Sequence, residues 1–140
     1  MAIIQSSGFA HVRLTVTDIA RCKAFYDQVF GWPTAVDASD RAGEPGVRES
    51  AEQFYGGVVY QTPSGALFGL RPVGSERFDS EVTGLDHVSF LLDSRAELDT
   101  AHAAFHEAGI EHGEVTDLDG FAILSFSDPD GMHLELTAAL

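Results

Sequence analysis

The alternation of apolar and polar residues in the first half of the chain predicts a strand, a helix and three further strands. Residues 8–17 alternate, with Ala10, Val12, Leu14 and Val16 on one side. A helix is expected over about 19–30, because Asp18 is a good N-cap and Gly31 and Pro33 end the pattern. The other predicted elements of this half are a strand at 34–38, a Gly-, Pro- and charge-rich loop over 39–52, and strands at 54–61 and 66–72.

The same order of elements returns in the second half. Residues 73–84 are polar and contain two glycines, which indicates a linker. A strand is expected at 85–92, and Ser94 with Glu97 forms a capping box that begins a second helix. The predicted helix ends at Gly109, and three more strands are expected at about 111–116, 121–127 and 132–138.

The chain therefore contains an internal repeat of two βαβββ modules. The pair His11-Val12 recurs as His87-Val88, and the turn at 63–65 recurs as the turn at 129–131. This pattern predicts an α+β fold in a single domain, with module one at about 8–72, the linker at 73–84 and module two at about 85–138.

Composition and charge narrow the class of protein. With 44% hydrophobic residues and 10 Phe, the chain can bury a sizeable core. A net charge of −14 argues against nucleic acid and anionic membranes as partners, and no apolar run is long enough to span a membrane. The start of the chain lacks the features of a signal peptide, and Cys22 is the only cysteine, so we expect a cytoplasmic protein with one buried thiol.

The last predicted strand carries the first candidate for site chemistry. Met132, Leu134 and Leu136 share one face, whereas His133, Glu135 and Thr137 share the other. A carboxylate on so apolar a strand is a solvated edge residue, a buried partner of a cation or a metal ligand. His11 and His87 lie on two other predicted strands and offer the imidazoles that a metal could bind.

Three segments of the chain resemble the vicinal oxygen chelate (VOC) superfamily: HVRLTVTDIARCKAFYDQVFGW, LDHVSF and FSDPDGMHLEL. That superfamily includes glyoxalase I, methylmalonyl-CoA epimerases, extradiol dioxygenases, fosfomycin-resistance enzymes and bleomycin-resistance binding proteins. The resemblance extends from Phe9 to Thr137. It implies two modules whose curved mixed sheets surround a cavity.

The resemblance also implies a set of metal ligands. The family places ligands on the first and last strand of each module, which gives His11, His87 and Glu135 here and puts Gly69 at the fourth position. Glyoxalase I and the epimerases fill all four positions. Two histidines and a carboxylate resemble the Fe(II) triad of extradiol dioxygenases, although these carry a tyrosine where this chain has Ser125. The expected cofactor is one divalent ion of Fe, Mn, Ni, Co or Zn.

Several further residues are candidates for roles around this site. His133 shares a face with Glu135 and is a candidate acid/base or a partner that orients the glutamate. Arg71 could pair with a substrate carboxylate or form an ordinary salt bridge. His102 and His106 flank the buried face of the second helix, and we expect both in solvent. The expected substrate-lining residues are Tyr55, Val59, Gly69, Arg71, Phe121, Ile123 and Ser125, whose partly apolar walls would favour a hydrophobic or aromatic substrate.

Two classes of function follow from these observations. The leading hypothesis is a metal-dependent lyase, isomerase or epimerase that binds a small substrate through two vicinal oxygens, with extradiol-type ring cleavage on Fe(II) as the alternative reaction. The second class is a non-catalytic protein that sequesters a drug or metabolite. The resemblance also predicts a homodimer.

Overall fold

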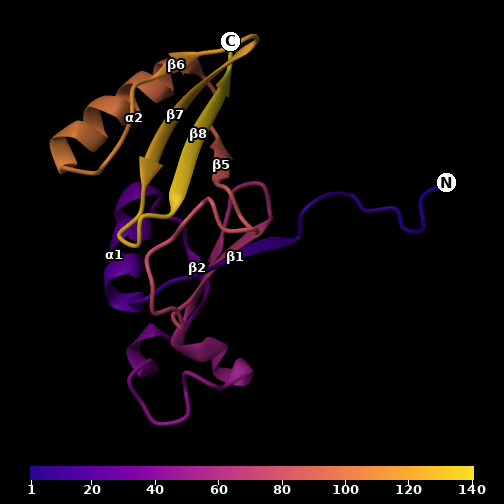
Figure 1. Ribbon diagram of the computed structural model, residues 1–140, viewed down its shortest axis with the longest axis vertical. Coiled ribbons are helices and arrows are strands. Elements are labelled where there is room, and N and C mark those ends of the chain that lie inside the picture. Colours follow the sequence, from indigo (N-terminus) through magenta and orange to yellow (C-terminus); the bar gives the residue numbers. More distant parts are fainter. The chain divides into compact units, whose positions relative to one another are not determined.

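The structure is a computed structural model that describes all residues from Met1 to Leu140. The chain divides into two compact units, Met1–Ser75 and Glu76–Leu140, and the boundary falls within the segment 73–84 that the sequence marked as polar (Figure 1). None of the helices has both the length and the apolar character needed to cross a membrane.

The first unit is a four-stranded sheet with one α-helix. Its strands lie in the order β1-β4-β3-β2, with β1 parallel to β4 and the other pairs antiparallel. The α-helix, α1, packs on β4. The elements are β1 (His11–Thr15), α1 (Ile19–Val29), β2 (Thr34–Asp37), β3 (Val58–Gln61) and β4 (Leu67–Arg71), together with the 3-10 helices η1 (Ser39–Arg41) and η2 (Ala51–Gly56).

The core of this unit forms where α1 meets the sheet. Asp18 caps α1 as predicted, since its carboxylate accepts a hydrogen bond from the Arg21 amide at 3.0 Å. Tyr26 on the buried face of α1 contacts Phe68 of β4, with ring centroids 5.3 Å apart. The Tyr60 hydroxyl donates to Oδ1 of Asp27 in α1 at 2.9 Å, and burial together with this bond raises the pKa of Tyr60.

The second unit has the same topology. Its strands lie in the order β5-β8-β7-β6, with β5 parallel to β8 and the remaining pairs antiparallel. In Figure 1, α2 lies alongside β7 and β8 as the orange helix beside the orange and yellow strands. The elements are β5 (Val88–Leu91), α2 (Arg95–Ala108), β6 (Thr116–Asp117), β7 (Phe121–Ser127) and β8 (His133–Ala139).

Helix α2 begins at the predicted capping box and covers an apolar sheet face. The Ser94 hydroxyl accepts from the Glu97 amide, while the Glu97 carboxylate accepts from the Asp93 amide, one residue before the cap. Phe105 of α2 packs on Phe126 of β7 with ring centroids 4.7 Å apart. The buried strand residues of this core are Ala122, Leu124, Phe126, Leu134, Leu136 and Ala138.

The strand registers show how the two modules correspond. Gly69 lies between Arg13 of β1 and Val59 of β3, just as Glu135 lies between Ser89 of β5 and Ser125 of β7. The registers thus align Gly69 with Glu135, as the positions of the two turns had indicated. The α+β fold with two βαβββ modules is confirmed.

The apolar alternation has the expected orientation within each module. Leu14, Leu134 and Leu136 are buried, whereas Val12 and Val88 are half-buried near the strand ends. His11 is exposed and alternates with Val12 and Leu14, so it lies on the face of its sheet away from α1.

The structure corrects several predicted boundaries. Strand β3 begins at Val58, and Tyr55 lies in η2 rather than in a strand. The alternation of a strand therefore does not determine the direction of the Tyr55 side chain. His87 lies just before β5. The predicted strand at 111–116 is reduced to β6 and to one isolated bridge, between His112 and Phe126. The segment 39–52 contains 3-10 turns and buries Val47, which is 2% exposed, although its sequence suggested little to bury.

Candidate functional site

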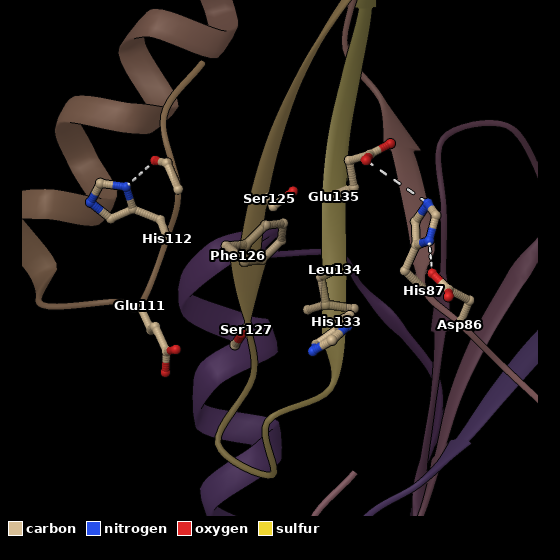
Figure 2. A pocket seen from close by; sticks show the side chains of 11 residues that line it. Asp86, His87, Glu111, His112, Ser125, Phe126, Ser127, His133, Leu134 and Glu135 are labelled. Carbon is tan, nitrogen blue, oxygen red and sulfur yellow. Dashed lines mark hydrogen bonds and ion pairs between the residues drawn. The ribbon is translucent and has the colours of Figure 1, made fainter. Parts of the chain in front are cut away.

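A pocket of about 440 Å³ opens on the face of the β5–β8–β7 sheet opposite α2. This volume lies within the range of small-ligand sites, which is about 300–1,000 Å³. Figure 2 shows the pocket with side chains from β7, β8 and the segments before β5 and β6. It is lined by Asp86, His87, Glu111, His112, Gly113, Ser125, Phe126, Ser127, His133, Leu134 and Glu135.

His87 and Glu135 are the two predicted metal ligands of this module, and the structure brings them together. Glu135 lies between the buried residues Leu134 and Leu136, so the strand period directs its side chain away from the core. The parallel pairing of β5 with β8 brings the start of β5 beside Glu135. The distance from His87 Nε2 to Glu135 Oε2 is 3.8 Å (Figure 2), which is too long for a hydrogen bond.

The other ring nitrogen of His87 is held by a neighbouring carboxylate. His87 Nδ1 lies 2.6 Å from Asp86 Oδ1 (Figure 2). An ionised carboxylate only accepts hydrogen bonds, so Nδ1 carries the proton and a neutral His87 keeps its lone pair on Nε2. This is the carboxylate–histidine arrangement that typically orients a metal-binding imidazole.

Glu135 is oriented from the opposite side by hydroxyl groups. The Thr137 hydroxyl donates to Glu135 Oε1 at 3.1 Å, and Ser89 and Thr137 share a further hydrogen bond of 2.5 Å. The Glu135 side chain is only 16% exposed, so these contacts hold a carboxylate that is largely withdrawn from water. Its second oxygen, Oε2, remains directed toward His87.

His133 lies on the same side of β8 as Glu135, as the alternation predicted. The residue is exposed and lines the pocket. The Phe78 ring contacts it edge-on, with centroids 5.3 Å apart, which restricts the imidazole from one side. Its ring nitrogens are therefore available to a ligand in the pocket.

The donor set of this module fits part of a divalent metal site. Imidazole nitrogen and carboxylate oxygen bind such ions at about 2.0–2.2 Å, so two ligands of one ion lie no more than about 4.4 Å apart. The 3.8 Å between His87 Nε2 and Glu135 Oε2 satisfies that limit. No third His, Cys, Asp or Glu completes a set of three within this unit. The remaining predicted ligand, His11, lies on β1 of the other unit, paired with Leu67.

The first unit has different chemistry at the corresponding position. Gly69 supplies no side chain, and a Cβ placed there would be 3.2 Å from Cγ of Arg13. The Tyr55 ring lies beneath Arg71, with 3.9 Å from the guanidinium carbon to the ring centroid. Val59 is half-buried opposite Gly69. Arg71 therefore makes a cation–π contact, and it forms no salt bridge of the ordinary kind considered above.

The pocket lining differs from the expectation in several places. Ser125 lines the pocket, whereas Phe121 and Ile123, further along β7, do not. The lining is mostly polar, in contrast to the apolar walls expected. The sequence reasoning missed Asp86, Glu111 and His112. Asp86 could have been identified as a carboxylate adjacent to a predicted ligand histidine.

The helix histidines also differ from the expectation. His102 is not fully in solvent, because its ring packs edge-on against His112 with centroids 4.8 Å apart. Its Nε2 lies 3.0 Å from a carboxylate oxygen of Glu114, but the angles do not make a hydrogen bond. His106 is exposed, as expected. Cys22 is buried, as expected of a structural thiol.

Solved structures with the same fold cover nearly the whole chain. A glyoxylase/bleomycin resistance protein/dioxygenase domain from Frankia sp. EAN1pec is 26% identical, with a TM-score of 0.77 over 97% of this chain and 100% of that one. A variant of the fosfomycin resistance protein FosX from Listeria monocytogenes, solved with Mn(II) and 1S,2S-dihydroxypropylphosphonic acid, is 19% identical, with a TM-score of 0.72 over 97% and 95% of the two chains. Lactoylglutathione lyase from Agrobacterium tumefaciens is 22% identical, with a TM-score of 0.68 over 95% and 94%.

A comparison with curated protein sequences finds no match. A comparison with models of protein families does identify the family. The model of the superfamily described as Glyoxalase/Bleomycin resistance protein/Dioxygenase matches residues 8–136. The family-model match covers both helices, every predicted site residue and all the strands except the last three residues of β8. The chain belongs to the Glyoxalase/Bleomycin resistance protein/Dioxygenase superfamily.

Proposed function

We propose that this protein is a metal-dependent enzyme that acts on a small substrate carrying two vicinal oxygens. His11, His87 and Glu135 are the proposed ligands of one divalent ion. The observation that carries the proposal is the Asp86–His87–Glu135 arrangement, in which one ring nitrogen is bonded to a carboxylate and the other faces Glu135. Histidines that bind a metal usually hydrogen-bond through their other ring nitrogen to a carboxylate or a carbonyl in this way.

The proposed reaction is a lyase, isomerase or epimerase step through an enolate or oxyanion. When bound, the divalent ion would supply Lewis acidity that stabilises negative charge on a substrate oxygen. His133 is the proposed group that takes or returns a proton at a ring nitrogen, because it lines the pocket two residues from Glu135. Ser125, which pairs with Glu135 in register, offers a hydroxyl to a substrate oxygen.

The neighbouring solved structures support a metal without naming the reaction. The FosX variant was solved with Mn(II) and a dihydroxypropylphosphonic acid, which bears two vicinal hydroxyl groups. An extradiol-type ring cleavage on Fe(II) would use the same three ligands. The residue across from Glu135 is Ser125 rather than the tyrosine of those enzymes, so we favour the enolate chemistry.

Proton exchange with solvent tests this proposal directly. Protein loaded with Mn(II), Ni(II) or Zn(II) would be incubated in deuterium oxide with a panel of α-hydroxy ketones and α-hydroxy acids, and exchange of the proton on the hydroxyl-bearing carbon next to the carbonyl would be followed by NMR. We expect catalysed exchange in the wild type, loss of exchange in Glu135→Gln, and a slower rate with retained metal in His133→Gln. Absence of exchange above the rate of the free ion, for every substrate and metal, would contradict the enolate mechanism.

A second candidate function is a protein that sequesters its ligand without turnover. The observation that favours it is Gly69, which removes one of the four ligand positions of the family and leaves space for Arg13. Tight binding of a small molecule to metal-free protein, unchanged in Glu135→Gln, would favour this function over the enzyme.

A further inference from the structure

We infer that module one contains an oxyanion-binding site formed by Arg13 and Arg71 on the ring of Tyr55. The expected ligand group is a carboxylate, a phosphate or a phosphonate. This inference does not depend on the metal site, since it uses residues of module one alone. It assigns a role to the position where Gly69 replaces a ligand side chain.

The Arg13 side chain lies close to Gly69. The two residues pair directly between β1 and β4. A Cβ at position 69 would meet Cγ of Arg13 at 3.2 Å and Cδ at 3.4 Å, so the arginine stem crosses the backbone where another residue would project. The stem of Arg13 therefore fills the space at Gly69 that the Glu135 side chain takes at the matching position of module two.

Two guanidinium groups lie against the same aromatic ring. The guanidinium carbon of Arg71 lies 3.9 Å from the Tyr55 ring centroid, and that of Arg13 lies 5.5 Å from it. Both distances are within the range of cation–π attraction. The two guanidinium carbons are therefore at most 9.4 Å apart, the sum of 3.9 Å and 5.5 Å, and an anion bound between them would offset the repulsion of their charges.

Neither Arg13 nor Arg71 is paired with a carboxylate of the protein. The chain has 22 acidic and 8 basic side chains, so a carboxylate partner should be easy to find. None of the ion pairs in the structure involves Arg13 or Arg71. The Nε of Arg71 is out of contact with solvent and has no hydrogen-bond partner. A buried donor without an acceptor is unusual and requires an explanation.

The backbone that carries the Tyr55 ring is strained. Phe54 and Tyr55 have φ angles of 50° and 58°, in the left-handed region that bulky residues rarely adopt. The Tyr55 amide donates a hydrogen bond to the Ser50 carbonyl, which stabilises the turn. The backbone at Gly57 lies so close to the Leu70 carbonyl that there is no room for a side chain. Strain of this kind persists where the surrounding structure enforces it, often at ligand sites.

Together these features point to a planar or tetrahedral oxyanion as the missing acceptor. Arginine presents its donors in a fork that matches both shapes. After a small movement of the Arg71 side chain, an oxygen of the anion can accept from its Nε–H. The same anion can accept from the Arg13 guanidinium.

An NMR titration of metal-free protein tests the inference. The probes are inorganic phosphate, methylphosphonate and acetate, each added at constant ionic strength set with sodium chloride. We expect saturable shifts of the Tyr55 and Gly69 amides and of the Arg71 Nε–H proton. Saturation by the two tetrahedral probes but not by acetate would assign the site to phosphate or phosphonate groups, and the reverse result would assign it to carboxylates.

Three variants that each remove one arginine charge distinguish a specific anion site from general electrostatic attraction. Arg13→Gln and Arg71→Gln should each weaken binding of the preferred probe at least tenfold, whereas Arg41→Gln, an exposed arginine of the same unit, should leave it unchanged. Gly69→Glu should abolish binding, because its carboxylate would occupy the site while the other residues remain. The inference is overturned if no probe gives saturable shifts, or if folded Arg71→Gln and Gly69→Glu proteins bind as the wild type does.

Discussion

Removing the carboxylate of Asp86 tests whether His87 is oriented for a metal. The change Asp86→Ala deletes the acceptor of the His87 Nδ1–H, which lies 2.6 Å away. Loss of such a partner typically weakens metal binding about 10–100-fold. The Asp86 side chain is 78% exposed, and water will replace part of the interaction.

We therefore expect the lower end of that range. A tenfold loss of affinity corresponds to about 1.4 kcal/mol. Asp86→Asn should lose less than Asp86→Ala, because the amide oxygen still accepts from Nδ1–H while the negative charge is gone. The affinity would be measured by competition for Zn(II) against a chromophoric chelator at constant pH.

The matched control for this experiment is Glu111→Ala. It removes another carboxylate from the lining of the same pocket but one that is not bonded to His87. We expect its Zn(II) affinity to stay within a factor of about two of the wild type, because a solvated charge acts weakly at a distance. Equal losses in Glu111→Ala and Asp86→Ala would show that only the total charge of the pocket matters, and our argument about orientation would be wrong.

Three further predictions concern the fold and the assembly. Burial and, after it, the bond to Asp27 raise the pKa of Tyr60, so the folded state favours the neutral phenol. The contribution of Tyr60 to the free energy of unfolding should therefore be complete below a pH of about 10 and should fall as the pH rises further. Urea unfolding across this range should show a smaller fall in Tyr60→Phe. Gly57→Ala should destabilise the protein by about 3 kcal/mol in thermal unfolding, because its Cβ would lie 2.0 Å from the Leu70 carbonyl oxygen. The control Gly43→Ala should unfold as the wild type does, because a Cβ at that position would have no atom within 4 Å. Light scattering at micromolar concentration should give the mass of a homodimer, and a monomer mass would contradict that expectation.

The sequence predicted the modules because their signals are local and repeated. Apolar alternation, the Asp18 and Ser94 caps and the turns before the last strands each depend on residues that are close in the chain. The turn at 128–131 illustrates this, since the Asp128 carboxylate accepts from the amides of Asp130 and Met132 within the same segment. The correspondence of Gly69 with Glu135 could also be inferred, because the turn before each of these strands sets its register against the preceding strand.

The parts that the sequence did not reveal depend on irregular backbone. Tyr55 belongs to an apolar run that reads as a strand, but the turn at 54–56 adopts left-handed backbone angles and begins the strand at Val58. Period-2 counting cannot place a side chain across such a turn. Asp86 was missed for a related reason: in a regular strand it would point away from His87, whereas both residues precede β5 and their side chains meet.

Metal analysis of Glu135→Gln beside the wild type tests the central claim most directly. Both proteins would be purified without a metal-binding tag, reconstituted with Fe(II), Mn(II), Ni(II), Co(II) or Zn(II), and passed through a desalting column before elemental analysis. The glutamine keeps the shape of Glu135 but removes the anion that faces His87 Nε2. We predict close to one equivalent of at least one metal in the wild type and a large loss of that metal in Glu135→Gln. Full occupancy in the variant, or no retained metal in the wild type with any of the five ions, would contradict the proposed metal site.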